Sequence, residues 1–231
     1  MRRYGPNQRT EAYKAFAASL NQVRYILRIE AKIPDPPTGR NTNKANALRA
    51  SALILNVSIF EYFLKAAFTE VADRINAISE RERRRLDQGL LDRNGFAFAE
   101  FIRNYKGSKS DRLAHIRQAA VRISADGLFA EAFGDTRASP KPQTVREMFD
   151  ALGTANVWPQ LASKYNSLGP PDAESAIVDR LQFLCETRNE VVHAGGGVRV
   201  SRLELQNYVM FTERLASAVD SLLRDEFHRF T

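Results

Sequence analysis

The sequence is poor in the residues that form disulfides and transition-metal sites. One cysteine, Cys185, occurs among 231 residues, so no disulfide can form within the chain. The three histidines, His115, His193 and His228, are far apart, and none has the short spacing to a second ligand that metal sites on helices use. We therefore expect no metal and no other cofactor, and a reducing environment such as the cytoplasm.

A long hydrophobic run is also missing. The most apolar stretch, residues 50–71, is too polar for a lipid-facing span and favours a buried helix. No apolar segment follows the first six residues, so we expect no signal peptide and no membrane partner. The side chains that interrupt the apolar stretch are Asn56, Ser58, Glu61, Tyr62, Lys65 and Thr69.

The positive charge is unevenly distributed. The formal net charge is +7, and the first 50 residues carry ten Lys/Arg against three Asp/Glu. A basic segment of this kind favours a polyanion such as RNA or DNA, or an acidic partner. A solvated, solubilising surface would produce the same composition, so both interpretations stay open.

Helical periodicity dominates the chain, and no segment alternates as a half-buried strand does. We predict an all-α fold, a four-helix-bundle-type domain that spans residues 1–231. Its long helices are expected at about 8–30, 43–78, 172–194 and 201–227. A helical insertion at about 79–165 separates the second long helix from the third.

Three local patterns support this organisation. The second long helix is apolar on more than one side, which is typical of the central helix of a bundle. Ser201 with Glu204 three residues later predicts a capping box at the start of the last helix. The insertion carries seven aromatic side chains that require burial and is therefore no linker; they are Phe96, Phe98, Phe101, Phe129, Phe133, Phe149 and Trp158.

A group of polar residues stands at the end of the third long helix. Asn189 and His193 are four residues apart and share a face of that helix. Arg188 falls within the apolar stripe that Ile177, Leu181, Leu184, Val191 and Val192 make, where an unpaired charge would be costly. Glu61, in line with the apolar side chains of the second helix, is the candidate partner of Arg188.

These three residue types suit the cleavage of RNA by its own 2′-hydroxyl. Histidine ionises near neutral pH and can move the proton, and the arginine fork can stabilise charge on the phosphate. Asparagine can orient either group, and the reaction requires no metal. Two structural alternatives remain: an Arg188–Glu61 pair that only fixes helix register, and a His193 that only interacts with the helix C-terminus.

The segment Arg188-Asn189-Glu190-Val191-Val192-His193 resembles the Arg-Asn-x3-His motif of the HEPN superfamily. The stretch from Leu48 to Lys65, with Glu61 inside an apolar run, is similar to the early helix of RiboL-PSP-type HEPN proteins. The resemblance covers both halves of the bundle and leaves the insertion unassigned.

The resemblance implies a metal-independent endoribonuclease with Arg188 and His193 as the active pair, Asn189 assisting and Glu61 in support. It also implies a homodimer in which two motifs face one cleft, and products with a cyclic phosphate and a 5′-hydroxyl. Many such proteins are toxins or phage-defence effectors restrained by an antitoxin or another regulatory partner. Other HEPN proteins are non-catalytic scaffolds that bind nucleotide, RNA or protein, which is the alternative function.

Overall fold

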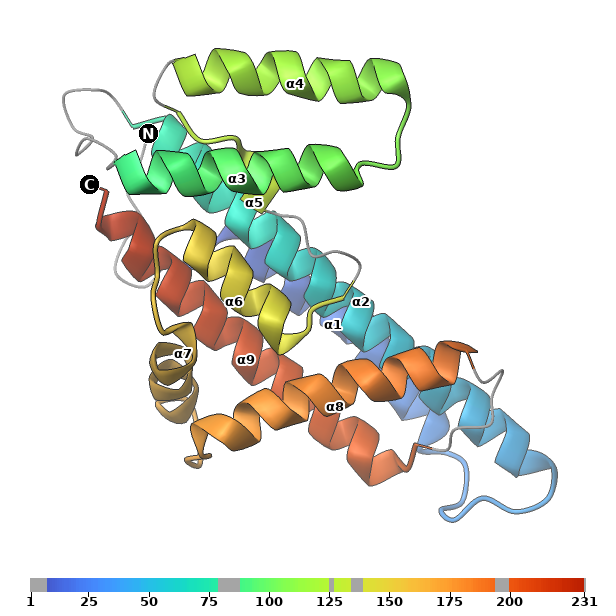
Figure 1. The fold of residues 1–231 in the computed structure, drawn as a ribbon. Helices are drawn as coiled ribbons and strands as arrows, with labels where there is room; N and C mark the ends of the chain where they lie inside the picture. Colours follow the sequence, from blue (N-terminus) through green and yellow to red (C-terminus); the bar gives the residue numbers. More distant parts are fainter. Residues whose placement is uncertain (1–7, 79–87, 125–126, 134–138, 194–199, 231) are drawn as a thin grey trace.

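The computed structural model describes residues 8–78, 88–124, 127–133, 139–193 and 200–230, and within these ranges the secondary structure is helical, without a strand. The predicted all-α fold is confirmed, with four long helices and five shorter ones between the second and third of them (Figure 1). The long helices end within about one turn of the predicted positions. The helices are α1 (Glu11–Glu30), α2 (Arg40–Asn76), α3 (Gln88–Asn104), α4 (Lys109–Ser124), α5 (Ala130–Phe133), α6 (Pro142–Ala151), α7 (Val157–Asn166), α8 (Glu174–His193) and α9 (Arg202–His228).

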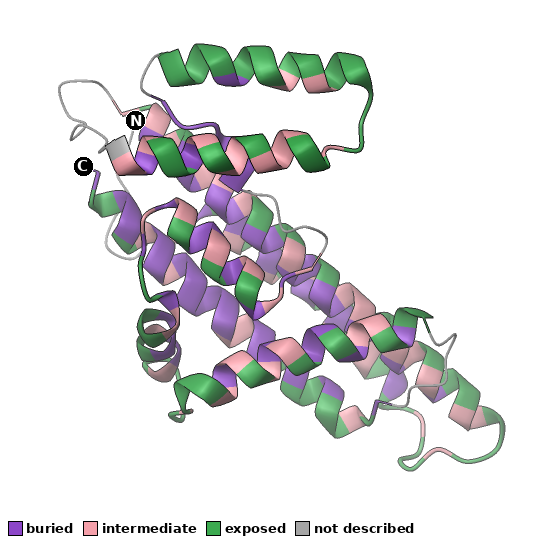
Figure 2. Ribbon diagram, in the orientation of Figure 1, coloured by how far each residue is buried: buried purple, intermediate pink, exposed green. Residues whose placement is uncertain are grey.

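Helix α2 is the centre of the fold, as its apolar pattern predicted. It packs against α1, α5, α8 and α9, and Leu53, Val57, Phe60, Leu64 and Phe68 are fully buried. Figure 2 shows buried positions along both α2 and α9, whereas α4 is exposed over most of its length. Of the helices in the described ranges, α2 alone has the length and apolar composition to cross a bilayer, a property that the core helix of a soluble protein shares.

The start of α1 is fixed to α9 by a buried carboxylate. Thr10 caps α1, with its hydroxyl oxygen accepting the Tyr13 N–H at 3.0 Å. The same hydroxyl donates to Asp220 Oδ1 at 2.6 Å, and the Thr10 N–H donates to that oxygen at 3.0 Å. Arg9 Nη1 completes the contact at 3.1 Å from Asp220 Oδ2. Because Asp220 is fully buried, these donors replace the water that its carboxylate would otherwise bind.

The end of α1 is fixed by a second buried carboxylate. Glu30, the last residue of α1, accepts hydrogen bonds from Arg49 of α2 at 2.7 Å and from Arg202 of α9 at 2.6 Å. Arg202 also donates to the Ile33 carbonyl at 2.6 Å. Ser201 and Glu204 form the predicted capping box at the start of α9. One glutamate therefore joins three long helices at this end of the bundle.

The insertion packs on the bundle partly through its aromatic side chains. Phe149 of α6 contacts Phe68 of α2 edge to face at 4.8 Å. Within the insertion, Phe129 contacts Phe98 in the same way at 4.7 Å. Phe133 is buried as well. The expectation for Phe96 was wrong, because its side chain is 74% exposed. Phe96 lies on the outer face of α3, and among the described residues no element covers that face.

Replacing Glu30 with glutamine should lower the free energy of unfolding by about 3–5 kcal/mol, because two arginines would lose their shared buried carboxylate. The matched control is Glu213→Gln, since the Arg24–Glu213 pair has 40% exposed side chains on both sides and should cost less than about 1 kcal/mol. Urea denaturation measures the free energy of unfolding of both variants. Equal losses in the two variants would contradict the structural role of Glu30.

Candidate functional site

Helix α8 buries one stripe of side chains against the bundle. Ile177, Leu181, Leu184 and Val191 are buried as predicted. The prediction for Val192 was wrong: its side chain is 48% exposed. Positions 177, 181, 184, 188 and 191 follow alternating steps of four and three residues and so share one face of α8. Val192 is turned about 100° away from Val191 and leaves that face. That register keeps Arg188 on the packed side of α8.

Arg188 reaches the core helix α2. Its Nη2 atom lies 3.6 Å from Oε2 of Glu61, with 19% and 24% of the two side chains exposed. The expected ion pair between α8 and α2 is therefore present. Its separation exceeds the 2.7–2.9 Å that is usual for a charge-assisted hydrogen bond. Both groups keep contact with solvent, so an anion can approach the guanidinium without opening the core.

Asn189 and His193 occupy the adjacent surface at the end of α8. Asn189 is half-buried, and His193 is exposed as the last residue of the helix. They stand one turn apart on one face, while Arg188 lies beside Asn189. The glycines after His193 lie outside the described residues. No group of three His, Cys, Asp or Glu side chains in the described ranges is arranged to hold a metal ion.

Thr187 of α8, one residue before Arg188, lies near Tyr208 of α9. The Thr187 hydroxyl donates to the Phe183 carbonyl at 2.8 Å, and both Thr187 and Tyr208 are buried. Burial raises the pKa of Tyr208, and the Thr187 side chain opposes that increase.

Two residues of the insertion, Ser139 and Lys141, lie near this site. The buried Cys185 thiol is near Ser139 and Lys141 of the insertion as well as Arg188 and Glu61. Burial raises the pKa of Cys185 to about 11, while the Ser139 hydroxyl and the positive charges of Arg188 and Lys141 oppose the increase. The insertion therefore contributes to the surroundings of Arg188, which depends on tertiary packing and has no local sequence signal.

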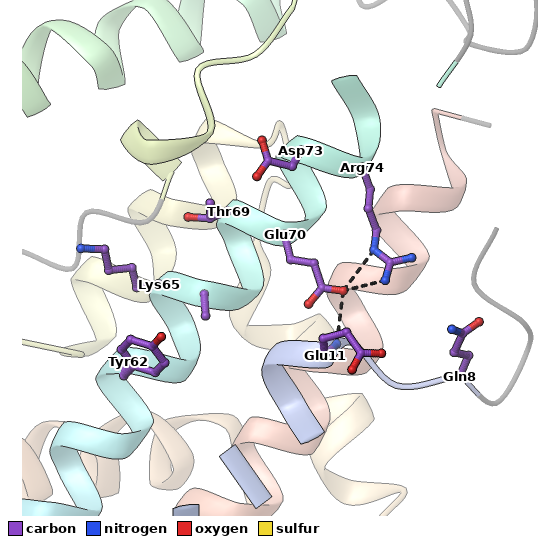
Figure 3. A pocket seen from close by; sticks show the side chains of 9 residues that line it. Gln8, Glu11, Tyr62, Lys65, Thr69, Glu70, Asp73 and Arg74 are labelled. Carbon is purple, nitrogen blue, oxygen red and sulfur yellow. Dashed lines mark hydrogen bonds and ion pairs between the residues drawn. The ribbon is translucent and has the colours of Figure 1, made fainter. Parts of the chain in front are cut away.

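A pocket lies elsewhere on α2 and is less suitable for RNA. It has a volume of about 760 Å³, and Figure 3 shows that Tyr62, Lys65 and Thr69 line one side of it. Glu70 within it accepts the N–H groups of Glu11 and Ala12 at 3.2 and 2.9 Å, so this carboxylate serves to fix the start of α1. Three acidic side chains line the pocket against two basic ones, an unfavourable balance for a polyanion.

Comparison with known families agrees with this geometry. The family model described as RiboL-PSP-HEPN matches residues 18–225, which includes α2, the insertion and the Arg188–His193 segment. The chain belongs to the RiboL-PSP-HEPN family. No curated protein and no solved structure shows significant similarity to it. HEPN domains are generally ribonucleases, so membership indicates a nuclease or another RNA-related function.

The burial of Cys185 near Arg188 leads to a testable prediction. At pH 8 a thiol with a pKa of about 11 instead of 9.0 has roughly a hundredfold less of the reactive thiolate. Alkylation by iodoacetamide, followed by mass spectrometry, should therefore be at least about 100-fold slower in the folded protein than in urea. Equal rates would show that Cys185 is accessible and ionised, which contradicts its placement in the core beside Arg188.

Proposed function

We propose that this HEPN protein is a metal-independent endoribonuclease. The observation that carries the proposal is the partly exposed Arg188–Glu61 pair beside Asn189 and His193, at one end of α8. The family is the second support, because HEPN domains are generally ribonucleases.

In the proposed reaction the 2′-oxygen of one nucleotide attacks the adjacent phosphorus. The bond from phosphorus to the 5′-oxygen breaks, which leaves a 2′,3′-cyclic phosphate and a 5′-hydroxyl. A base takes the proton from the 2′-hydroxyl, and an acid gives a proton to the leaving 5′-oxygen. His193 is the proton-transfer group. Arg188 stabilises the charge that develops on the non-bridging oxygens, and Asn189 orients the phosphate.

Glu61 is a positioning residue in this scheme. It limits the rotamers of Arg188 and directs the guanidinium toward the surface that Asn189 and His193 share. Its carboxylate also cancels part of the arginine charge in the free protein. A phosphate that binds to Arg188 therefore competes with Glu61, whose Oε2 lies 3.6 Å from the guanidinium.

The proposal includes a homodimer. One imidazole cannot both accept the 2′ proton and donate to the leaving group in a single step, whereas two copies about a two-fold axis supply both. His193 is exposed at the end of its helix, where a second copy can reach the same phosphate.

The cellular role that we infer is that of a cytoplasmic toxin or phage-defence effector, with an antitoxin or similar partner as its regulator. Support for this role comes only from the type of activity, since unrestrained RNA cleavage is harmful to its host. Growth arrest on expression of the wild-type chain, relieved by His193→Ala, would support it. Equal growth of the two strains, with active enzyme present, would count against it.

Purified wild-type protein should cut a mixed RNA substrate in EDTA. We expect His193→Ala to lower the rate about 100- to 10,000-fold and Arg188→Ala about 100- to 1,000-fold, as is usual for a proton-transfer group and for a charge-stabilising donor. Glu61→Gln should reduce kcat less than Arg188→Ala and should lower KM, because the substrate phosphate no longer competes with a carboxylate for Arg188. Gel-resolved initial rates provide the measurement.

The matched controls for these variants are Arg180→Ala, two turns earlier on α8, and His228→Ala near the end of α9. Both should retain wild-type rates, and circular dichroism should show all variants folded. A His193→Ala protein that cuts at the wild-type rate would overturn the proposed mechanism. A folded wild-type protein that binds RNA without cutting it would favour the non-catalytic HEPN scaffold.

Mixing wild-type protein with His193→Ala tests the dimer. Sedimentation should give the mass of two chains. After refolding, an equal mixture should keep about a quarter of the wild-type activity, because only dimers with two intact histidines are active. If each chain contained a complete site, the same mixture would keep about half.

A further inference from the structure

The start of α6 lies level with Glu61 along the bundle. Phe149 of α6 contacts Phe68 of α2, and the two helices run in the same direction in Figure 1. Lys141 precedes Phe149 by eight residues, about 12 Å along a helix, and Glu61 precedes Phe68 by seven residues, about 10.5 Å. Lys141 and Glu61 therefore reach the same level of the fold.

Contacts with α8 agree with this register. Helix α6 packs against α8. Burial raises the pKa of the Cys185 thiol, and the charge of Lys141, at the start of α6, is close enough to oppose that increase. Arg188 follows Cys185 by three residues, on the same side of α8. Three separate segments thus meet near Arg188: the middle of α2, the end of α8 and the residues that precede α6.

The backbone at Lys141 is well fixed. Lys141 is the N-cap of α6, its carbonyl accepts the Val145 N–H at 3.0 Å, and the next residue, Pro142, is buried. The Lys141 side chain is half-buried. Its ammonium forms no ion pair with any carboxylate in the parts of the chain that the structure describes. Such a cation keeps its charge available for an anionic ligand.

A second cation near Arg188 would favour binding of the phosphate and of the transition state. Glu61 offsets the charge of Arg188, so the pair alone contributes little net positive potential. The transition state of phosphodiester cleavage carries more negative charge on the phosphate oxygens than the bound substrate does. A further positive group near Arg188 would stabilise the transition state more than the ground state, and that difference accelerates the reaction.

We propose that Lys141 is a second phosphate-binding residue of the Arg188 site, contributed by the insertion, and that its ligand is the scissile phosphodiester of RNA. This inference rests on the proposed ribonuclease function. The insertion then has a chemical role at the site in addition to its packing on α2.

The first test separates kcat from KM for a defined RNA oligonucleotide in EDTA. Lys141→Ala should lower kcat about 10- to 100-fold, and Lys141→Arg should restore most of it, because the charge returns on a side chain of similar length. Arg146→Ala is the matched control: it removes one positive charge from the exposed face of the same helix and should leave kcat unchanged. Thermal unfolding of each variant verifies the fold.

The second test measures binding without turnover. A single-stranded DNA oligonucleotide of the same sequence lacks the 2′-hydroxyl and serves as the probe, in a His193→Ala background. Loss of one phosphate contact should reduce the slope of log Kd against log salt by roughly 0.7 for Lys141→Ala, with no change for Arg146→Ala.

The outcomes distinguish the two proposals. If wild-type protein cuts RNA and Lys141→Ala has the same kcat and the same salt slope, the proposed role of Lys141 is overturned. The ribonuclease proposal would stand. Wild-type protein that does not cut RNA, although its DNA binding depends on Lys141, overturns the ribonuclease and keeps the phosphate subsite. Failure of Lys141→Arg to restore kcat, with the fold intact, would also contradict a role through charge.

Discussion

The rest of the structure depends on the burial of α2. This helix carries apolar side chains on several faces, and no single neighbour can cover them. Helices α1, α8 and α9 pack around it, and the insertion supplies α5 and the aromatic contact from α6. The location of the candidate site follows from that packing. The end of α8 crosses α2 near Glu61, and there Arg188 reaches the Glu61 carboxylate. The Glu61 carboxylate offsets part of the cost of holding Arg188 within the apolar stripe of α8.

Two arginine–glutamate pairs in this fold differ in their distance and in their exposure to solvent. Arg49 and Glu30 are 2.6 Å apart with 6% and 1% of their side chains exposed, and Arg202 binds the same carboxylate. Arg188 and Glu61 are 3.6 Å apart with 19% and 24% exposed. The first pair is closed to ligands and joins three helices. The second keeps solvent contact beside Asn189 and His193, which suits an arginine that must exchange its carboxylate for a phosphate.

Much of this could be predicted from sequence, since the signals are local. Periodicity located the four long helices, and the spacing of Ser201 and Glu204 predicted the cap of α9. An arginine in an apolar stripe required a carboxylate partner, and Glu61 was the one placed in line on the central helix. Local patterns failed where the answer depends on neighbours, as with the exposed side chains of Phe96 and Val192.

The contribution of the insertion to the site could not be predicted. Lys141 stands level with Glu61 because Phe149 packs on Phe68 about two helical turns away, a contact between distant segments that leaves no pattern near Lys141. The basic N-terminal region was ambiguous for a similar reason. Three of its arginines, Arg9, Arg24 and Arg49, form ion pairs with Asp220, Glu213 and Glu30, so part of its charge serves the fold.

Analysis of the ends of the RNA products tests the central claim most directly. Wild-type protein would be incubated in EDTA with an RNA oligonucleotide and with a copy that carries one 2′-deoxy nucleotide at the cleaved position. The account predicts a 2′,3′-cyclic phosphate and a 5′-hydroxyl by mass spectrometry, and no cleavage at the deoxy position. Products with a 3′-hydroxyl and a 5′-phosphate, or cutting that tolerates the deoxy nucleotide, would contradict it.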